Sequence, residues 1–317
     1  MAVAPPRDTP RVNESTEQSL PTDVAVAIAD ALPGADPARA TIAGVGWDVV
    51  AWRVPASDGD WLARVPRHEG APRAIEDQTC LMRALAPLGF PVPPEPRLVR
   101  DVRGRVVAGL YRYVQGRPAE VRGAPERERL ARGLAAFVSR LHAVDFDRLE
   151  ACRVRRYEPW RDEFAPMVER VLPHLAPRTA SWLRARAELL AELSDRLPPP
   201  VLVHADLKPK HVLLRADGGI AGVLDFESIP VTDPAFEFSR IWQNWDRALA
   251  ERVLAHYDRH ADPELMQRAE AYLDFDVVAV LDSAFKREDM AHWTPRAKRM
   301  LAARAAWSVR RQAGKRP

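Results

Sequence analysis

The sequence has few cysteines and no long apolar run, and each of these absences excludes some classes of protein. Only Cys80 and Cys152 occur among 317 residues, in unrelated local contexts. We therefore expect neither a disulfide framework nor a cysteine-based metal site, as suits a reducing cytoplasm. No segment approaches the length of a membrane span, and the first residues lack the apolar core of a signal peptide. The sequence thus predicts a cytoplasmic protein with no membrane partner.

An excess of one charge is also missing. The chain has 47 basic and 44 acidic side chains, a formal net charge of +3. The charges are interspersed, so we expect no nucleic-acid partner despite a sequence pI near 9.0. A hydrophobic content of 47% and a charged content of 29% are ordinary for a globular chain with one or two cored lobes. We detect no internal repeat and expect a monomer.

The stretch from residue 201 to residue 225 is the most informative. Three apolar runs predict short buried strands, at residues 201–203, 212–214 and 220–224. Asp-Gly-Gly at 217–219 predicts a hairpin turn between the last two. Asp206, His211 and Asp225 then fall at consecutive strand ends, where a rigid scaffold can present side chains to a ligand. This set predicts a metal–phosphate site, and the alternative is a buried hairpin whose Asp residues cap turns.

These residues stand in an order that resembles the aminoglycoside phosphotransferase family. The matching segments are His204-Ala-Asp206-Leu-x-Pro-x-His211, Ile-Ala-Gly-Val-Leu-Asp225-Phe-Glu and Asp233-Pro-Ala-Phe-Glu-Phe. The His at 211, where most kinases have Asn, is similar to the aminoglycoside 2''-phosphotransferase and macrolide phosphotransferase branches. The resemblance covers roughly residues 40–290. Ala205 and Glu227 stand where the family usually has Gly, and we expect them to alter loop geometry without supplying a ligand.

The resemblance implies a bilobal, protein-kinase-like α+β fold. A small antiparallel-sheet N-lobe over residues 22–109 would bind the nucleotide, and residues 110–116 would form a hinge. A large, mainly helical C-lobe over residues 117–317 would hold the catalytic loop and the substrate. Prolines and scattered charges in the first twenty residues predict a disordered leader over residues 1–21.

The resemblance also implies an enzyme that transfers the γ-phosphoryl of ATP or GTP to a hydroxyl. Asp206 would orient and deprotonate that hydroxyl, while His211 and Asp225 would hold Mg²⁺. Asp233 would brace the catalytic loop. Because a metal-bound imidazole must be neutral, metal affinity should fall as pH drops through the titration of His211. Alternatively, His211 only hydrogen-bonds the catalytic loop.

Two features of the first half would contact the nucleotide phosphates. Gly44 and Gly46 lie between two predicted strands, where their backbone could approach phosphate, although a plain hairpin turn explains them equally well. Arg64, on the third predicted strand, falls where protein kinases use Lys to grip the phosphates. Arg at this place resembles the macrolide kinases, and its guanidinium can bind phosphate in bidentate fashion.

The next predicted helix and the hinge complete the nucleotide site. Glu76 could pair with Arg64 and fix it for phosphate contact, although Asp77 and Gln78 are neighbouring candidates. A solvated surface acid is an equally good interpretation of Glu76. By resemblance, the nucleotide base would meet hinge backbone at Leu110, Tyr111, Arg112 and Tyr113.

The substrate class depends on composition near the C-terminus. Six acids and two bases lie between Glu270 and Asp289, and such a face would attract a polycationic aminoglycoside. A solvated helix edge explains the acids equally well, while Trp242 and Trp245 could line a more apolar pocket for a macrolide or nucleoside antibiotic. We expect an antibiotic kinase, with an aminoglycoside favoured. The alternatives are a small-metabolite kinase and an inactive nucleotide-binding protein.

Overall fold

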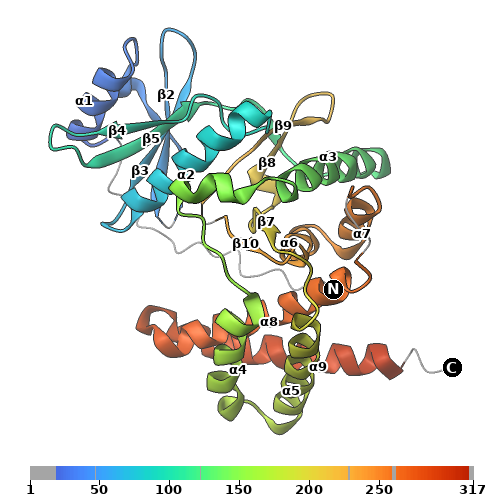
Figure 1. Cartoon of the computed structure of the whole chain (residues 1–317). Coiled ribbons are helices and arrows are strands. Elements are labelled where there is room, and N and C mark those ends of the chain that lie inside the picture. Colours follow the sequence, from blue (N-terminus) through green and yellow to red (C-terminus); the bar gives the residue numbers. More distant parts are fainter. Residues whose placement is uncertain (1–18, 47, 122, 228, 259–261, 314–317) are drawn as a thin grey trace.

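The chain folds into two lobes, as the computed structural model shows (Figure 1). The structure describes residues 19–46, 48–121, 123–227, 229–258 and 262–313. Most of the predicted leader, residues 1–18, lies outside the described residues. Within them, no helix has both the length and the apolar character that a membrane crossing requires. The α+β class and the kinase-like division into lobes are confirmed.

The N-lobe is built on a five-stranded antiparallel sheet in the order β1-β2-β3-β5-β4. Its strands are β1 (Thr41–Val45), β2 (Val49–Val54), β3 (Trp61–Pro66), β4 (Arg97–Arg100) and β5 (Val106–Arg112). Alternate side chains of β2 and β3, among them Trp52 and Trp61, are buried in one core with the apolar face of α1 (Thr22–Ala31). This core gives Arg64 of β3 a rigid base.

The helix α2 (Ala71–Leu85) belongs to both lobes. Its first half packs on the sheet, where Ile75 approaches Gly109 so closely that a Cβ there would lie 2.8 Å from the Ile75 Cγ2 atom. Its second half is part of the C-lobe core through Leu81, Met82 and Leu85. A displacement of α2 would therefore disturb both lobes.

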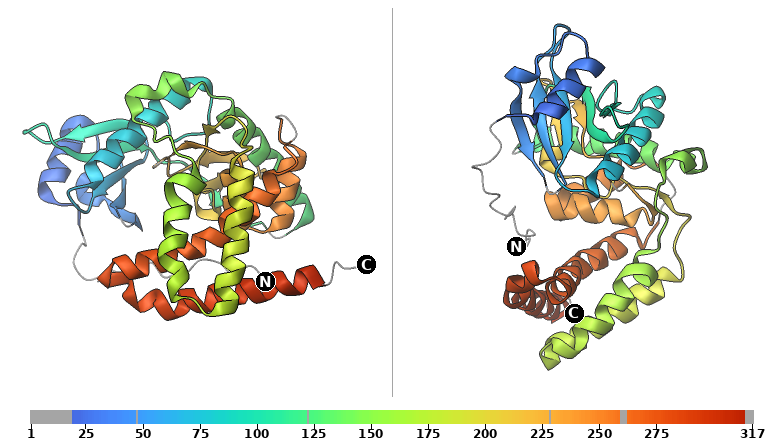
Figure 2. Two further views of the ribbon diagram at one scale, coloured as in Figure 1. Left: turned by 60° about the horizontal axis from the view of Figure 1, so that its bottom comes forward. Right: turned by 90° about the vertical axis from the view of Figure 1, so that its left-hand side faces the viewer.

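Seven α-helices of the described chain form the C-lobe. They are α3 (Ala124–His142), α4 (Ala165–Val171), α5 (Pro177–Ser194), α6 (Ala235–Asn244), α7 (Arg247–Ala255), α8 (Leu265–Lys286) and α9 (Thr294–Ala313). Helices α4, α5, α8 and α9 gather into a layer farthest from the sheet (Figures 1 and 2). Phe164 of the π-helical turn η4 (Pro159–Phe164) stacks on Phe275 of α8, with ring centroids 5.2 Å apart. Aromatic packing of this kind fixes α8 against the rest of the lobe.

Short strands between the lobes position the catalytic residues. β7 (Val201–Leu202) pairs with β10 (Val231–Thr232), while β6 (Arg117–Pro118), β8 (Val212–Leu214) and β9 (Ile220–Val223) form a second small sheet. The predicted hairpin is confirmed, because β8 and β9 pair across a turn in which Gly218 adopts a positive φ of 85°. The Asp217 carboxylate accepts a hydrogen bond from the Gly219 amide at 2.8 Å.

The two cysteines form a disulfide, which the sequence analysis did not expect. Cys80 of α2 is bonded to Cys152, at the end of the 3-10 segment η3 (Phe146–Cys152), although 72 residues separate them. The expectation was wrong because local context carries no information about which distant segments tertiary packing brings together. A cross-link that closes a loop of this length stabilises a fold by about 4 kcal/mol in the chain-entropy account.

Candidate active site

The catalytic loop leaves β7 through a strained turn. Ala205 adopts a left-handed conformation with φ of 64°, which costs a residue with a Cβ roughly 1–2 kcal/mol and explains why Gly is common at this place in the family. Preceding it, the buried His204 ring interacts through Nε2 with the Leu224 carbonyl at 3.0 Å. The loop is thus tied to the chain that leads into Asp225. We expect Ala205 to keep this strained conformation because the contact between His204 and Leu224 holds the loop in place.

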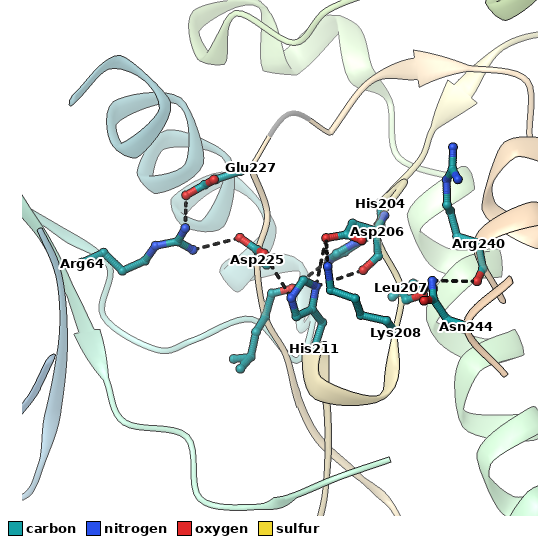
Figure 3. A network of polar contacts seen from close by, with 11 residues as sticks. Arg64, His204, Asp206, Leu207, Lys208, His211, Asp225, Glu227, Arg240 and Asn244 are labelled. Atoms are coloured by element: carbon teal, nitrogen blue, oxygen red, sulfur yellow. Dashed lines mark hydrogen bonds and ion pairs between the residues drawn. The ribbon is translucent and has the colours of Figure 1, made fainter. Parts of the chain in front are cut away.

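Asp206, His211 and Asp225 meet at the loop, as the sequence predicted (Figure 3). Each offers one ligand atom, and these atoms lie within 4.8 Å of one another. His211 Nε2 is 3.2 Å from Asp225 Oδ2, and His211 Nδ1 is 3.0 Å from the Asp206 carbonyl oxygen. Two carboxylates and one imidazole form a donor set that can hold a divalent cation.

The tautomer of His211 supports a cation at this site. A carbonyl oxygen only accepts hydrogen bonds, so Nδ1 must carry the hydrogen in the neutral ring. The lone pair of Nε2 then faces the Asp225 carboxylate at 3.2 Å. Two electron-pair donors at this separation repel each other unless a cation lies between them, and the residues therefore fit a metal ion. The role of His211 as a metal ligand stays a prediction.

Burial keeps the His211 ring neutral at physiological pH. Desolvation lowers the pKa of His211 to about 4, although Asp225 and Asp206 act to raise it. The sequence could not place the pH of this titration, because a pattern of residues says nothing about how deeply the ring is buried.

We accordingly expect the Mg²⁺ requirement of the enzyme to stay level between about pH 8 and pH 6. It should rise only as the pH approaches about 4 to 5, because protonation of Nε2 then removes a ligand. The measurement is the Mg²⁺ concentration for half-maximal activity against pH, in wild type and in His211→Asn. A requirement that already climbs between pH 7 and pH 6 in the wild type alone would contradict the buried, neutral ring.

Arg64 lies on the N-lobe side of the same site, and its partners differ from the predicted one. Its Nη1 donates to Asp225 Oδ1 at 3.0 Å and its Nη2 to the Glu227 carboxylate (Figure 3). Burial lowers the pKa of Arg64, but the neighbouring Tyr111 and Asp225 raise it by more, so the pKa lies above its ordinary value. Arg64 therefore carries its charge next to the predicted metal ligand. Glu227, for which the sequence analysis expected no ligand role, supplies its second anchor.

The predicted pair between Arg64 and Glu76 is replaced by other contacts. Glu76 interacts with Arg100 at 3.0 Å and with Arg153 at 3.3 Å. Side chains two residues apart point to nearly opposite sides of a helix, and it is Gln78 that faces inward. Gln78 is buried, and its Oε1 accepts a hydrogen bond from the Tyr111 hydroxyl at 3.4 Å. Any nucleotide-binding role of Glu76 stays a prediction.

The Asp225 carboxylate is held in its charged form. Burial raises its pKa, but neighbouring positive charge, chiefly that of Arg64, lowers it by more, so the pKa of Asp225 lies below its ordinary value. Asp225 also has a positive φ of 66°, a second non-glycine residue of this site in the left-handed region. Strained backbone and a stabilised anion at one residue are typical of a functional position.

Lys208 is a site residue that the sequence analysis missed. Its Nζ is 2.6 Å from Asp206 Oδ2, and both side chains are partly exposed. A cation two residues after the predicted catalytic carboxylate was the available signal. The ammonium is thus the positive charge nearest to the predicted catalytic carboxylate on its own loop.

The brace of the catalytic loop is Glu237 rather than Asp233. Glu237 is fully buried, and its Oε2 accepts a hydrogen bond from the His204 amide at 2.6 Å. Burial raises the pKa of Glu237 to about 8. Asp233 instead holds Arg268 at 2.7 Å and the Tyr272 hydroxyl at 2.6 Å, which fixes α6 to α8. Both residues belong to the same motif, and spacing alone did not show which one faces the loop.

The remaining residues predicted to contact the nucleotide lie at the end of β1 and at the start of the predicted hinge. Gly44 and Gly46 fall on either side of the β1 end, and the Gly46 carbonyl accepts a hydrogen bond from Arg67 at 2.7 Å. The predicted hinge begins inside β5, whose Leu110, Tyr111 and Arg112 pair with β3. The amides of Arg112 and Tyr113 already donate to the carbonyls of Pro94 and Asp60, at 2.9 Å and 3.0 Å. Contact of these six residues with a nucleotide stays a prediction.

The acidic face that was expected to attract an aminoglycoside is largely neutralised from within. Asp274 pairs with Arg186 at 2.7 Å, and Asp276 pairs with Arg240 at 2.5 Å. Asp282 and Asp289 likewise pair with Arg170 and Arg287. Counting residues along α8 could not reveal bases contributed by other helices. The acid count therefore gives no support to a polycationic substrate.

The aromatic residues proposed as an alternative pocket are part of the protein interior. Trp242 and Trp245 are half-buried and pack against the main core. The Trp245 indole donates a hydrogen bond to the Ala119 carbonyl at 2.9 Å. Their interpretation as core side chains is therefore favoured over an apolar substrate pocket.

Comparison with known proteins agrees with this geometry. The model of the phosphotransferase enzyme family matches residues 39–272. Viomycin phosphotransferase from Streptomyces vinaceus is 31% identical over 150 residues, which span 45% of this chain and 52% of that protein. The structure of APH(2'')-IIIa with GDP and kanamycin superposes with a TM-score of 0.74 at 20% identity, covering 89% of this chain and 98% of that one. Macrolide 2'-phosphotransferase MphH from Brachybacterium faecium gives 0.69 at 23% identity, covering 89% and 96%.

Proposed function

Because this chain belongs to the phosphotransferase enzyme family, we propose that it transfers the γ-phosphoryl of ATP or GTP to a hydroxyl of an antibiotic. The observation that carries the proposal is the convergence of Asp206, His211 and Asp225 in one site beside Arg64. The three retain the chemistry that such a transfer requires, which argues against an inactive nucleotide-binding protein. An Mg²⁺ ion, when bound, would neutralise charge on the nucleotide phosphates.

The residues of the site divide the work of the reaction. Asp206 takes up the proton of the acceptor hydroxyl and orients the hydroxyl oxygen toward the phosphoryl group. His211 and Asp225 would hold the metal ion, and Arg64 would turn its guanidinium to the nucleotide phosphates. Catalysis of phosphoryl transfer consists mainly of positioning and charge stabilisation. By fixing the orientation of the site residues, β3, β8 and β9 would contribute directly to the rate.

Lys208 has a role in the transfer step. We expect Lys208→Ala to lower kcat by about tenfold to a hundredfold while the affinity for nucleotide changes little, since the ammonium would meet charge that develops only in the transition state. The measurement is steady-state kinetics with both substrates varied. Lys210, two residues further along the chain and exposed, offers the matched control: Lys210→Ala should behave as wild type. A Lys208→Ala defect confined to KM would contradict the assignment.

The substrate class is proposed to be an aminoglycoside. The support comes from the solved relative that binds kanamycin and from one carboxylate of the C-lobe. Glu163 in η4 is half-buried, and no hydrogen bond to its carboxylate is found among the described side chains. Burial raises its pKa, against the opposing effect of Arg155 and Arg240. A cationic amine would relieve this cost. Viomycin is a second candidate, because the relative from Streptomyces vinaceus is named viomycin phosphotransferase.

The cytoplasm is the proposed location, since the nucleoside triphosphate donor is supplied there. A thermal-shift panel tests the proposal. It would contain kanamycin, viomycin, a macrolide and an amino alcohol, each with and without Mg²⁺ and a nonhydrolysable ATP or GTP analogue. We expect stabilisation by an antibiotic that increases when the nucleotide is present. Stabilisation by the amino alcohol alone would instead favour a small-metabolite kinase.

A further inference from the structure

The disulfide joins two segments that the hinge separates. Cys80 lies in the second half of α2, a helix whose first half packs on the N-lobe sheet, and Cys152 lies in η3 of the C-lobe. The two are 72 positions apart in the sequence, and the segment between them includes β4, β5 and α3. They are the only cysteines of the chain. The bond therefore constrains how the two lobes can move relative to each other.

An ion-pair cluster lies beside the bond and spans the same junction. Arg153, which follows Cys152, holds Asp77 at 2.6 Å and Glu76 at 3.3 Å, both on α2. These side chains are exposed enough for water and salt to weaken the contacts, and pairs of this kind contribute little by themselves. When the disulfide is open, the junction would rest on apolar packing and on these weak pairs. The disulfide is thus the strongest link between α2 and η3 on the exposed side of their contact.

The opposite face of α2 leads from the disulfide to the active site. Gln78, two residues before Cys80, is buried and bonded to the Tyr111 hydroxyl at 3.4 Å. Arg64 pairs with Gly109, two residues before Tyr111, so the Arg64 and Tyr111 side chains lie on the same face of the sheet, and Arg64 donates to Asp225 at 3.0 Å. Gln78 and Tyr111 therefore connect α2 with the strands that carry the guanidinium expected to bind the nucleotide phosphates.

We propose that the Cys80–Cys152 disulfide is a reversible clamp that holds α2 and Arg64 in place and so tightens nucleotide binding when it is closed. The proposal rests on the nucleotide site proposed above. A site whose parts are already fixed loses less conformational freedom when its ligand binds. Oxidation should therefore raise the affinity for Mg-nucleotide, and reduction should lower it.

Opening the clamp is an ordinary thiol–disulfide exchange with a dithiol reductant. One thiolate of the dithiol attacks a sulfur of the bond and releases the other cysteine as a thiolate. The second thiol of the reductant then attacks the mixed disulfide and leaves as a cyclic disulfide. Two electrons and two protons thus pass to Cys80 and Cys152. Cys152 is buried, whereas Cys80 is only half-buried, so a small reductant would reach the bond from the Cys80 side.

The test compares Mg-ATP and Mg-GTP binding by calorimetry in oxidised and dithiothreitol-reduced protein. We expect the dissociation constant to rise by about fivefold on reduction, at the low end of the range for coupled sites. Cys80→Ser and Cys152→Ser should match the reduced wild type under both conditions. Arg153→Gln retains both cysteines and should keep the redox response. The reduced wild type keeps the test valid if a serine variant fails to fold.

Linkage provides a second readout that a purely structural disulfide would not move. If closure tightens nucleotide binding, nucleotide must favour closure by the same factor. Mg-nucleotide should therefore increase the ratio of disulfide to dithiol by about fivefold in a glutathione redox buffer, measured by thiol alkylation and mass spectrometry. Equal affinities in both redox states, or a ratio that ignores nucleotide, would overturn the clamp. Absence of nucleotide binding in every form would instead overturn the proposed nucleotide site.

Discussion

Asp206→Asn is expected to lower kcat by at least about a hundredfold while nucleotide binding is retained. The amide keeps the shape of the carboxylate, but it cannot take up the proton of the acceptor hydroxyl. Asp206 is 44% exposed, and its side-chain contacts are with Lys208 and His211. The variant should therefore fold normally, and the loss should belong to chemistry.

The comparison variant for Asp206 is Asp217→Asn. Asp217 lies in the β8–β9 turn, where it accepts a hydrogen bond from Gly219 that an asparagine oxygen can also accept. The same chemical change there should leave kcat at the wild-type value. Steady-state kinetics with ATP and with GTP would decide between the two variants. Near-normal turnover of Asp206→Asn would show that another group receives the hydrogen.

Asp225→Ala is expected to abolish Mg²⁺-dependent nucleotide binding. A carboxylate is the best ligand that a protein offers to a hard cation, and the substitution would also release the Arg64 guanidinium. Calorimetry with Mg-ATP and Mg-GTP measures the loss. We expect any residual binding to be independent of Mg²⁺.

Glu227→Gln separates the two roles of Asp225, which are to bind the metal ion and to hold the Arg64 guanidinium. Glu227 is the other acid on Arg64, and this variant removes its negative charge but leaves an oxygen that can still accept from the guanidinium, while the proposed metal donors are unchanged. Its nucleotide affinity should fall only a few-fold, as expected for one charged hydrogen bond at a partly buried site. Equal and complete losses in both variants would mean that Arg64, and not the metal ion, carries nucleotide binding.

The sequence predicted the catalytic strands well because their signals are local. Apolar runs, a Gly-rich turn and carboxylates at strand ends are each contained in a few residues, and residues 201–225 have all three. The convergence of Asp206, His211 and Asp225 followed from strand pairing, which the turn at 217–219 makes nearly obligatory.

Contacts between distant elements could not be predicted in the same way. Whether Glu76 or Gln78 faces the protein interior depends on the rotation of α2, and a shift of two residues reverses the answer. Asp274 is neutralised by Arg186 of α5 and Arg304 of α9, which no count along α8 can reveal. The same limitation concealed the Cys80–Cys152 bond. Residue chemistry was visible in the sequence, whereas the choice of partner required the tertiary fold.

Direct detection of a phosphorylated antibiotic tests the central claim. Purified protein would be incubated with Mg²⁺, ATP or GTP, and kanamycin, viomycin or a macrolide, and the products would be weighed by mass spectrometry. We predict an antibiotic that gains one phosphoryl group, only with Mg²⁺ and not with Asp206→Asn. Nucleotide hydrolysis without a phosphorylated antibiotic, or equal product from Asp206→Asn, would contradict the account.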